Sequence, residues 1–244
     1  MRPLVLCYHA VSETWHHELS VPADVMERQL TLLLRLGYRP ASAAETVTGT
    51  GKLLHVTFDD AFASVSNALP VLERTGVRAT IFACTGYADD GRPPEIPELA
   101  DELRARPAEL ATMTWDELRA LEERGIEVSS HTVSHPHLTT LSDAELAHEL
   151  GSSRQRLEDE LGHPCRVLAY PYGECDERVR AAARAAGYEA AFGLPGDATG
   201  RDRFELFRVG VWNGEGLPRV ALKASSFARS PLGMRLRGAL GLTT

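Results

Sequence analysis

The sequence contains the run Leu53-Leu54-His55-Val56-Thr57-Phe58-Asp59-Asp60, which is apolar until it ends in two adjacent carboxylates. A short apolar run of this kind is typical of a buried strand. Asp59 and Asp60 stand where that strand passes into a loop. In chains that alternate strands with helices, active sites gather at such strand ends. The two carboxylates therefore mark a candidate functional site.

A second predicted strand end carries two imidazoles, in His131-Thr132-Val133-Ser134-His135-Pro136. One Asp together with His131 and His135 makes a three-ligand set that leaves a coordination position open for water, as catalytic zinc requires. The other Asp is then free to act as a base. Taken alone, the Asp pair also fits a helix N-cap, and the two His fit hydrogen-bonded loop positions. Taken together, these residues predict a metal-dependent hydrolase.

Composition and charge narrow the class of protein. The 244 residues are 43% hydrophobic and 25% charged, which is ordinary for a globular protein. A net charge of −8 argues against an extended nucleic-acid surface. No apolar run approaches the roughly 18 residues of a membrane span, and residues 4–8 are too short for a signal-peptide core. Because the four cysteines lack a zinc-knuckle spacing, we expect reduced thiols in a cytoplasmic protein.

Strand and helix patterns alternate along most of the chain. The predicted strands lie at 4–8, 53–58, 79–83, 126–130, 166–169, near 188–192 and at 206–212. The predicted helices lie at 22–36, before Gly76, at 115–125, at 143–162 and around 176–186. Capping boxes at Thr114 and Ser142 open two of these helices. Repeated β-then-α units imply a mostly parallel sheet, and seven or eight of them favour closure into a barrel.

Two segments stand outside this alternation. Residues 85–112 are rich in Pro, Asp and Glu, and long insertions of this kind commonly serve as lids or binding loops. After Glu215 no acidic residue occurs, whereas basic residues accumulate beside Leu, Phe and Met. We therefore predict a barrel at 1–215 and a basic C-terminal helical extension at 216–244. This extension is expected to pack on the acidic barrel or, as an alternative, to make weak contact with an anionic membrane surface.

Three motifs, in order, resemble those of polysaccharide deacetylases, the NodB-homology domain of carbohydrate esterase family 4. Thr57-Phe58-Asp59-Asp60-Ala61 resembles the motif TFDDG, and residues 131–136 resemble H-[ST]-x-x-H-P. Ala169-Tyr170-Pro171-Tyr172-Gly173 resembles the third motif, whose core is PYG. The resemblance covers about residues 4–212. It implies an α/β fold, a distorted TIM-like (β/α)7-8 barrel in a single domain.

The resemblance also implies roles for individual residues. Asp59 matches the general base, and Asp60 matches a metal ligand together with His131 and His135. The backbone N–H of Tyr172 matches a donor that stabilises the oxyanion. Two His and one carboxylate suit Zn²⁺ well, while Co²⁺, Ni²⁺ and Fe²⁺ fit the same donors.

The sequence departs from this family's pattern at several positions. Ala61 replaces the usual Gly, which is expected to alter the turn after the carboxylates. Ala169 stands where many members have an Arg that orients the base, and no Asp-x-x-Asp-Trp motif appears downstream. No His follows His163, so the family's usual C-terminal catalytic His is missing.

The N-terminus offers a replacement for that His. Val5-Leu6-Cys7-Tyr8-His9 resembles the opening of a circularly permuted branch that includes deacetylases of poly-N-acetylglucosamine. In that branch the His of the opening strand takes the general-acid role, which falls on His9 here. Arg208 is a candidate for the missing Arg beside the base.

These expectations lead to one reaction and two alternatives. The first is hydrolysis of acetyl groups from N-acetylated amino sugars of a polysaccharide or glycoconjugate, with metal-activated water, an Asp base and a His acid. The second has the same fold but hydrolyses a different bond, either an O-acetyl ester or the non-peptide C–N bond of a cyclic amide. The third is a catalytically weakened carbohydrate-binding protein, which Ala61 and Ala169 favour. We expect a carbohydrate as the partner, and no nucleic acid.

Overall fold

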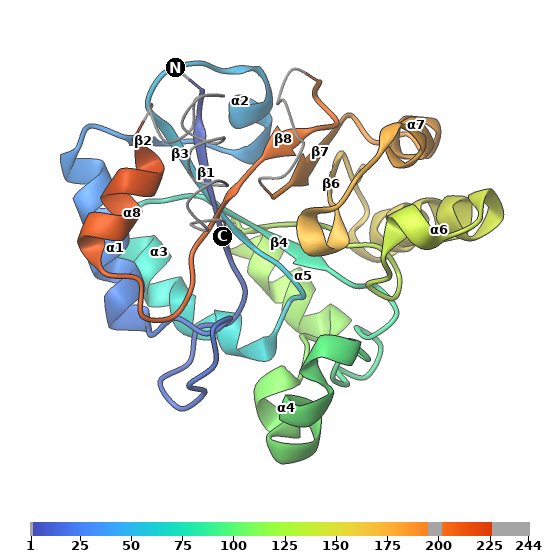
Figure 1. The fold of residues 1–244 in the computed structure, drawn as a ribbon, viewed down its shortest axis with the longest axis horizontal. Helices are drawn as coiled ribbons and strands as arrows, with labels where there is room; N and C mark the ends of the chain where they lie inside the picture. Colours follow the sequence, from blue (N-terminus) through green and yellow to red (C-terminus); the bar gives the residue numbers. More distant parts are fainter. Residues whose placement is uncertain (1, 195–201, 226–244) are drawn as a thin grey trace.

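The chain forms a single barrel of parallel strands wrapped by helices (Figure 1). The computed structural model describes residues 2–194 and 202–225. The α/β barrel predicted from the alternation of strands and helices is confirmed.

The strands make one continuous sheet in the order β8-β7-β6-β5-β4-β3-β1-β9, with parallel pairing throughout. Its longer strands are β1 (Leu4–Tyr8), β3 (Leu53–Phe58), β4 (Ala79–Ala83), β5 (Glu127–Ser130), β6 (Val167–Ala169) and β7 (Ala190–Gly193). β2 (Arg39–Pro40) pairs with the start of β3 and was not expected from the sequence. Since all strands run the same way, their carboxyl ends meet at one face of the barrel.

One extended segment bridges the two edges of the sheet. β8 (Leu206–Phe207) pairs with β7, and β9 (Val209–Gly210) pairs with β1. Arg208 lies between them, fully buried, and its backbone N–H donates to the carbonyl of Gly193 at 2.8 Å. The predicted strand at 206–212 is therefore two short strands, because successive residues pair with opposite edges of the barrel.

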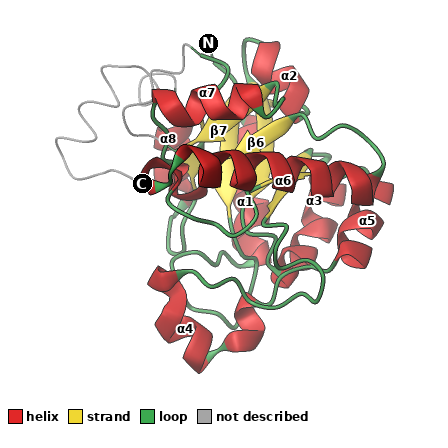
Figure 2. Cartoon of the chain, turned by 90° about the vertical axis from the view of Figure 1, so that its right-hand side faces the viewer, coloured by secondary structure: helices red, strands yellow, loops and turns green. Residues whose placement is uncertain are grey.

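Helices cover the outside of the sheet, and Figure 2 shows α6 and α7 lying across β6 and β7. They include α1 (Ala23–Arg35), α2 (Ala43–Thr48), α3 (Leu69–Thr75), α5 (Trp115–Glu123), α6 (Asp143–Leu161) and α7 (Glu177–Ala185), with a 3-10 helix at Ala63–Ala68 before α3. Both predicted capping boxes are present, at Thr114 and Ser142. A third, at Ser42, opens α2, which the sequence pattern did not predict. α6 ends at Gly162, whose φ of 75° closes the helix in the left-handed conformation.

Residues 85–112 are more regular than expected. They contain α4 (Ala100–Ala105), with 3-10 turns on either side, and project from the barrel (Figures 1 and 2). Ile96 and Leu99 are buried in one apolar cluster with Trp15 of the loop after β1. The Trp15 indole N–H donates to Glu102 at 2.8 Å. Side-chain burial therefore holds the middle of this segment in place, while Thr112 at its end forms an isolated antiparallel bridge with Phe62.

The start of the C-terminal extension packs against the barrel. α8 (Leu217–Ala224) lies beside α1 in Figure 1. Lys223 is buried, donates to the Gly210 carbonyl at 2.8 Å and lies 2.5 Å from Glu215. The rest of the extension, where the membrane-contact prediction mostly falls, lies outside the described residues. Within the described ranges, no helix is both long enough and apolar enough to cross a membrane.

His55 on β3 is a buried structural residue. Its side chain is 1% exposed, with Nδ1 2.8 Å from the Ala41 carbonyl and Nε2 2.9 Å from the Thr80 hydroxyl. Burial lowers the pKa of His55 from 6.5 to about 4. Between these two values the unfolded chain binds a proton at this position and the folded chain does not.

We expect the free energy of unfolding to fall as the pH drops through this window. The contribution of His55 to that fall is about 3 kcal/mol, since one pKa unit corresponds to about 1.4 kcal/mol. Urea unfolding at pH 7, 6, 5 and 4 measures this fall, and the His55→Gln variant should show a shallower dependence than the wild type. Equal slopes in the two proteins would contradict the assignment.

Candidate active site

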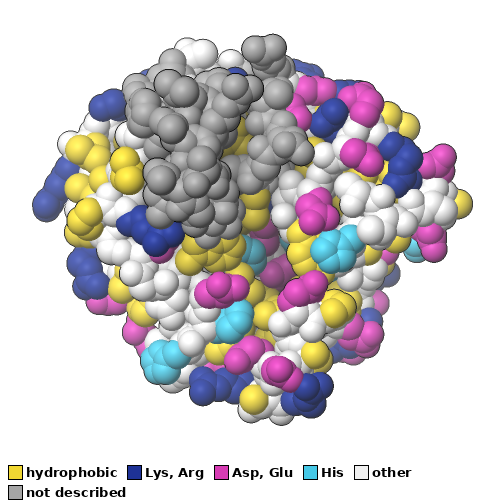
Figure 3. Space-filling model, viewed as in Figure 1, with side chains coloured by type: hydrophobic (Ala, Val, Ile, Leu, Met, Phe, Trp, Pro, Cys, Tyr) yellow, Lys and Arg dark blue, Asp and Glu magenta, His cyan; other side chains and the backbone are white. Residues whose placement is uncertain are grey.

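The carboxyl ends of the strands open into a cleft of about 710 Å³. Six of the seven predicted site residues line it, namely His9, Asp59, Asp60, His131, His135 and Tyr172. His9 follows β1, the two Asp follow β3, and His131 follows β5. Tyr172 lies three residues after the end of β6. Figure 3 shows histidine and acidic side chains gathered on this face. The seventh residue, Arg208, reaches the site by contacting Asp59.

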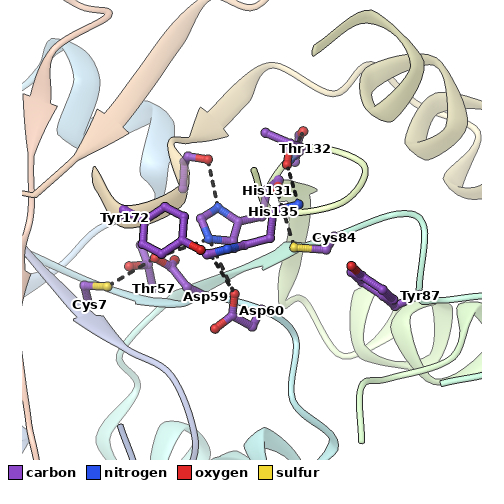
Figure 4. Close-up of polar contacts among 12 residues, drawn as sticks. Cys7, Thr57, Asp59, Asp60, Cys84, Tyr87, His131, Thr132, His135 and Tyr172 are labelled. Atoms are coloured by element: carbon purple, nitrogen blue, oxygen red, sulfur yellow. Dashed lines mark hydrogen bonds and ion pairs between the residues drawn. The ribbon is translucent and has the colours of Figure 1, made fainter. Parts of the chain in front are cut away.

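Asp60, His131 and His135 form a compact group of ligand atoms, all within 4.8 Å of one another (Figure 4). The Oδ1 atom of Asp60 lies 3.6 Å from Nε2 of His131 and 3.4 Å from Nε2 of His135. Nδ1 of His131 donates to the Ala169 carbonyl at 2.8 Å, which leaves its Nε2 lone pair facing Asp60. The Asp60 Oδ1 atom is buried without a hydrogen-bond partner. A buried anionic oxygen of this kind is costly unless a cation meets it. The three residues therefore fit a divalent metal.

The backbone around the site is strained. Within the described ranges, positive φ angles outside glycine occur at Asp60 (67°), Ala61 (52°), Thr132 (71°), His135 (62°) and Tyr172 (58°). Each such residue costs on the order of 1–3 kcal/mol and persists only where the surrounding structure enforces it. Ala61 thus adopts a left-handed conformation of the kind that favours Gly. The replacement adds strain at this turn.

Asp59 is held by Arg208. Nη1 and Nη2 of Arg208 donate to the two carboxylate oxygens at 2.5 and 2.8 Å, and both side chains are buried. Paired hydrogen bonds of this geometry fix a carboxylate in orientation. Burial acts to raise the pKa of Asp59, but Arg208 and His131 hold it well below its ordinary value. Asp59 is therefore ionised at neutral pH, in the form that accepts a proton.

Two residues without a predicted role complete the surroundings of Asp59. Thr57 accepts from Nη1 of Arg208 at 3.0 Å and donates to the Leu6 carbonyl at 2.9 Å. The Cys7 thiol donates to Oδ2 of Asp59 at 3.4 Å. Cys7 and Thr57 are register partners across β1 and β3. Strand alternation could have identified both residues. Cys7 lies two residues before His9, and Thr57 lies two residues before Asp59, so each faces the same side of its strand as the predicted catalytic residue.

His9 lies against Trp212 at the edge of the cleft. The two rings stack with centroids 5.4 Å apart, and His9 is 9% exposed. Its Nδ1 atom is buried and has no hydrogen-bond partner. Burial lowers the pKa of His9, while the nearby charges of Asp59 and Asp60 act to raise it. A lowered pKa makes the protonated ring a stronger acid.

A second polar cluster, formed by Tyr172, His137, Glu98 and Glu174, stands at the mouth of the cleft. The Tyr172 and His137 rings stack at 3.8 Å, and the Tyr172 hydroxyl donates to Glu98 at 3.0 Å. Nδ1 of His137 lies 3.1 Å from Glu174, and its Nε2 lies 3.6 Å from Glu98. The Tyr172 ring also meets the His135 ring edge-on at 4.6 Å. Sequence reasoning assigned no function to the last three members of the cluster, although His137 and Glu174 directly follow motif residues.

Two loops contribute to the walls of the cleft. Residues 85–112 contribute Ile96, Glu98 and Leu99, and the loop after β1 contributes His17, Glu18 and Leu19. The long segment at residues 85–112 therefore borders the cleft.

Comparison with known proteins agrees with the motif-based expectation. A family model described as polysaccharide deacetylase matches residues 46–191, more than half of the chain. A putative polysaccharide deacetylase of Bacillus subtilis, YxkH, is 25% identical over 217 residues, covering 85% of this chain and 70% of that protein. Chitin deacetylase 1 of Cryptococcus neoformans is 36% identical over 107 residues, covering 41% of this chain and 23% of that protein.

A solved structure shows the same fold. The Streptococcus pyogenes deacetylase PplD, in complex with acetate, has a TM-score of 0.76 at 21% identity, with 92% of this chain and 99% of that chain covered. The family model includes all three motifs but neither His9 nor Arg208. The roles of these two residues therefore depend on their geometry in this chain.

Proposed function

The chain belongs to the polysaccharide deacetylase family, and from this premise we propose that it is a metal-dependent hydrolase that removes acetyl groups from N-acetylated amino sugars of a polysaccharide or glycoconjugate. One observation carries the proposal. The Asp60–His131–His135 group and the ionised, Arg-paired carboxylate of Asp59 converge at one end of the barrel, inside a cleft.

Asp60, His131 and His135 are the proposed metal ligands. When bound, the metal polarises the substrate carbonyl and lowers the pKa of a coordinated water to about 7. The unpartnered Oδ1 atom of Asp60 and the orientation of His131 support this assignment. Two imidazoles and a carboxylate favour Zn²⁺, and Co²⁺, Ni²⁺ and Fe²⁺ suit the same donors.

Asp59 is the proposed base. It takes one proton from the attacking water as the new C–O bond forms, and Arg208 keeps its carboxylate oriented during this transfer. The C–N bond then breaks, and the leaving nitrogen takes a proton from His9, so that acetate and a free amine result. The backbone N–H of Tyr172 is the proposed donor to the oxyanion, an interaction whose loss typically costs about 10²–10³ in rate.

The proposed function is tested by acetate release from N-acetylated chito-oligosaccharides. We expect metal-stripped protein to be inactive and to recover on addition of Zn²⁺ or Co²⁺, with one amine formed per acetate. Acetate release without metal would contradict the metal dependence. Release from O-acetylated but not from N-acetylated saccharides would replace amide hydrolysis with ester hydrolysis.

His9→Ala is expected to lower kcat by about 10²–10⁴-fold with a much smaller change in KM, because the proton donor acts only when the C–N bond breaks. Steady-state kinetics gives kcat and KM, and the metal content of each protein is measured alongside. His148→Ala, at an exposed histidine of α6 outside the cleft lining, is the matched control. An unchanged kcat would remove His9 from the mechanism.

A further inference from the structure

Beyond the reaction centre, the cleft carries charge of one sign. Among the described residues that line it are the carboxylates of Glu18, Glu98 and Glu174, and no Lys or Arg side chain is among them. The nearby Arg178 donates to the backbone carbonyl of the cleft residue Thr139. Its guanidinium also pairs with Asp143 at 3.1 Å. The negative charge at the mouth is therefore not balanced by a Lys or Arg side chain of the described cleft wall.

Glu98 and Glu174 are positioned by the same pair of rings. They contact opposite nitrogens of His137, which stacks on Tyr172, and Tyr172 in turn contacts the metal-site residue His135. A hydrogen bond from its own backbone N–H and one from Tyr172 lower the pKa of Glu98, which therefore stays ionised at neutral pH. Glu98 thus stands one ring, and Glu174 two rings, away from the proposed metal ligand His135.

The cleft also holds polar atoms that lack a partner. Nδ1 of His9, a side chain only 9% exposed, and Nε1 of Trp212 are buried without hydrogen bonds, and both residues line the cleft. Buried polar groups in native proteins nearly always have a partner. The hydroxyl and amide groups of a saccharide supply such partners, so the cleft as a whole is built for a polar ligand.

We propose that the cleft selects a saccharide in which a sugar next to the reacting N-acetyl group carries a free, protonated amine, with Glu98 and Glu174 as the receptors of that ammonium group. This inference rests on the proposed function. A low-dielectric cleft lined by one sign of charge concentrates ligands of the opposite charge. It also disfavours sugars that carry carboxylate or phosphate groups.

The selection has a consequence for the product. Each hydrolysis creates one free amine, so a completed reaction generates the neighbour that the next reaction prefers. Deacetylation of a polymer is then expected to proceed in blocks of adjacent sugars.

The test compares two tetrasaccharides that differ in charge and contain no acetyl group, the β-1,4-linked tetramers of glucosamine and of glucose. Calorimetric titration of the full, metal-loaded chain gives a Kd for each. We expect the wild type to bind the glucosamine tetramer roughly tenfold more tightly at low salt. In the Glu98→Gln/Glu174→Gln variant this ratio should fall about three- to tenfold, the scale of two partly exposed charge pairs. Gln retains an acceptor for the Tyr172 hydroxyl.

Glu189→Gln is the matched control, because Glu189 is an exposed, ion-paired carboxylate outside the cleft lining. The wild-type ratio should also shrink as salt approaches about 1 M, where the screening length is about 3 Å. A ratio that is the same in the double variant and the wild type would overturn the inference. Since neither tetramer is hydrolysed, this result is independent of acetate release. A failure of the proposed function would appear only in the acetate assay.

Discussion

Asp59→Asn is expected to bind metal like the wild type and to lose turnover by up to about 10⁴-fold. The amide has no carboxylate oxygen free to accept a proton from water, while the neighbouring residues Asp60, His131 and His135 are unchanged. The substitution also places an amide donor opposite one nitrogen of the Arg208 fork, where the carboxylate now accepts at 2.5 and 2.8 Å. We therefore expect a stability loss of about 1–3 kcal/mol alongside the loss of rate.

Three measurements separate these effects. Metal content per chain reports the ligand set, urea unfolding reports the lost hydrogen bond, and kcat reports the base. Asp24→Asn, at an exposed carboxylate paired with Arg28 on α1, is the matched control. A rate near that of the wild type, with metal bound, would show that another group removes the proton.

Asp60→Ala and His135→Ala are each expected to abolish tight metal binding, and activity with it. Each removes one of three ligands, and the remaining two do not complete the site. The test does not depend on activity. Because a metal that binds only the folded chain raises its stability, Zn²⁺ should raise the unfolding midpoint of the wild type and leave both variants unmoved.

His137→Ala is the matched control for the two ligand variants, because His137 lies at the mouth and its Nε2 faces Glu98 rather than Asp60. Its unfolding midpoint should still respond to Zn²⁺. Full metal occupancy in Asp60→Ala or in His135→Ala would contradict the ligand assignment.

Local features of this protein follow from its sequence. The long strands, the capping boxes at Thr114 and Ser142 and the glycine that ends α6 were all predicted, because each depends on hydrogen bonds or apolar contacts between near neighbours. Asp59 and His131 were expected at strand ends for the same reason. Parallel strands then bring those ends to one face, so the meeting of the aspartates with His131 follows from the alternation.

The other part of the site depends on closure of the barrel. Arg208 and Asp59 are 149 positions apart, and they meet because the chain crosses from β7 to β1 at residues 206–210. That crossing also explains why the predicted strand there is two short ones. No local pattern encodes which of two sheet edges a residue pairs with.

At the mouth of the cleft, too, some residues could be located from the sequence and others only from the tertiary structure. His137 and Glu174 follow their motifs in the sequence, but Glu98 comes from an insertion whose position is set by the buried contacts of Ile96 and Leu99 with Trp15. The sequence by itself determined the barrel, the order of its elements and the residue types at the strand ends, since these depend on local periodicity. Only the tertiary structure decided which charges face one another across the cleft, because such contacts form after distant segments have packed.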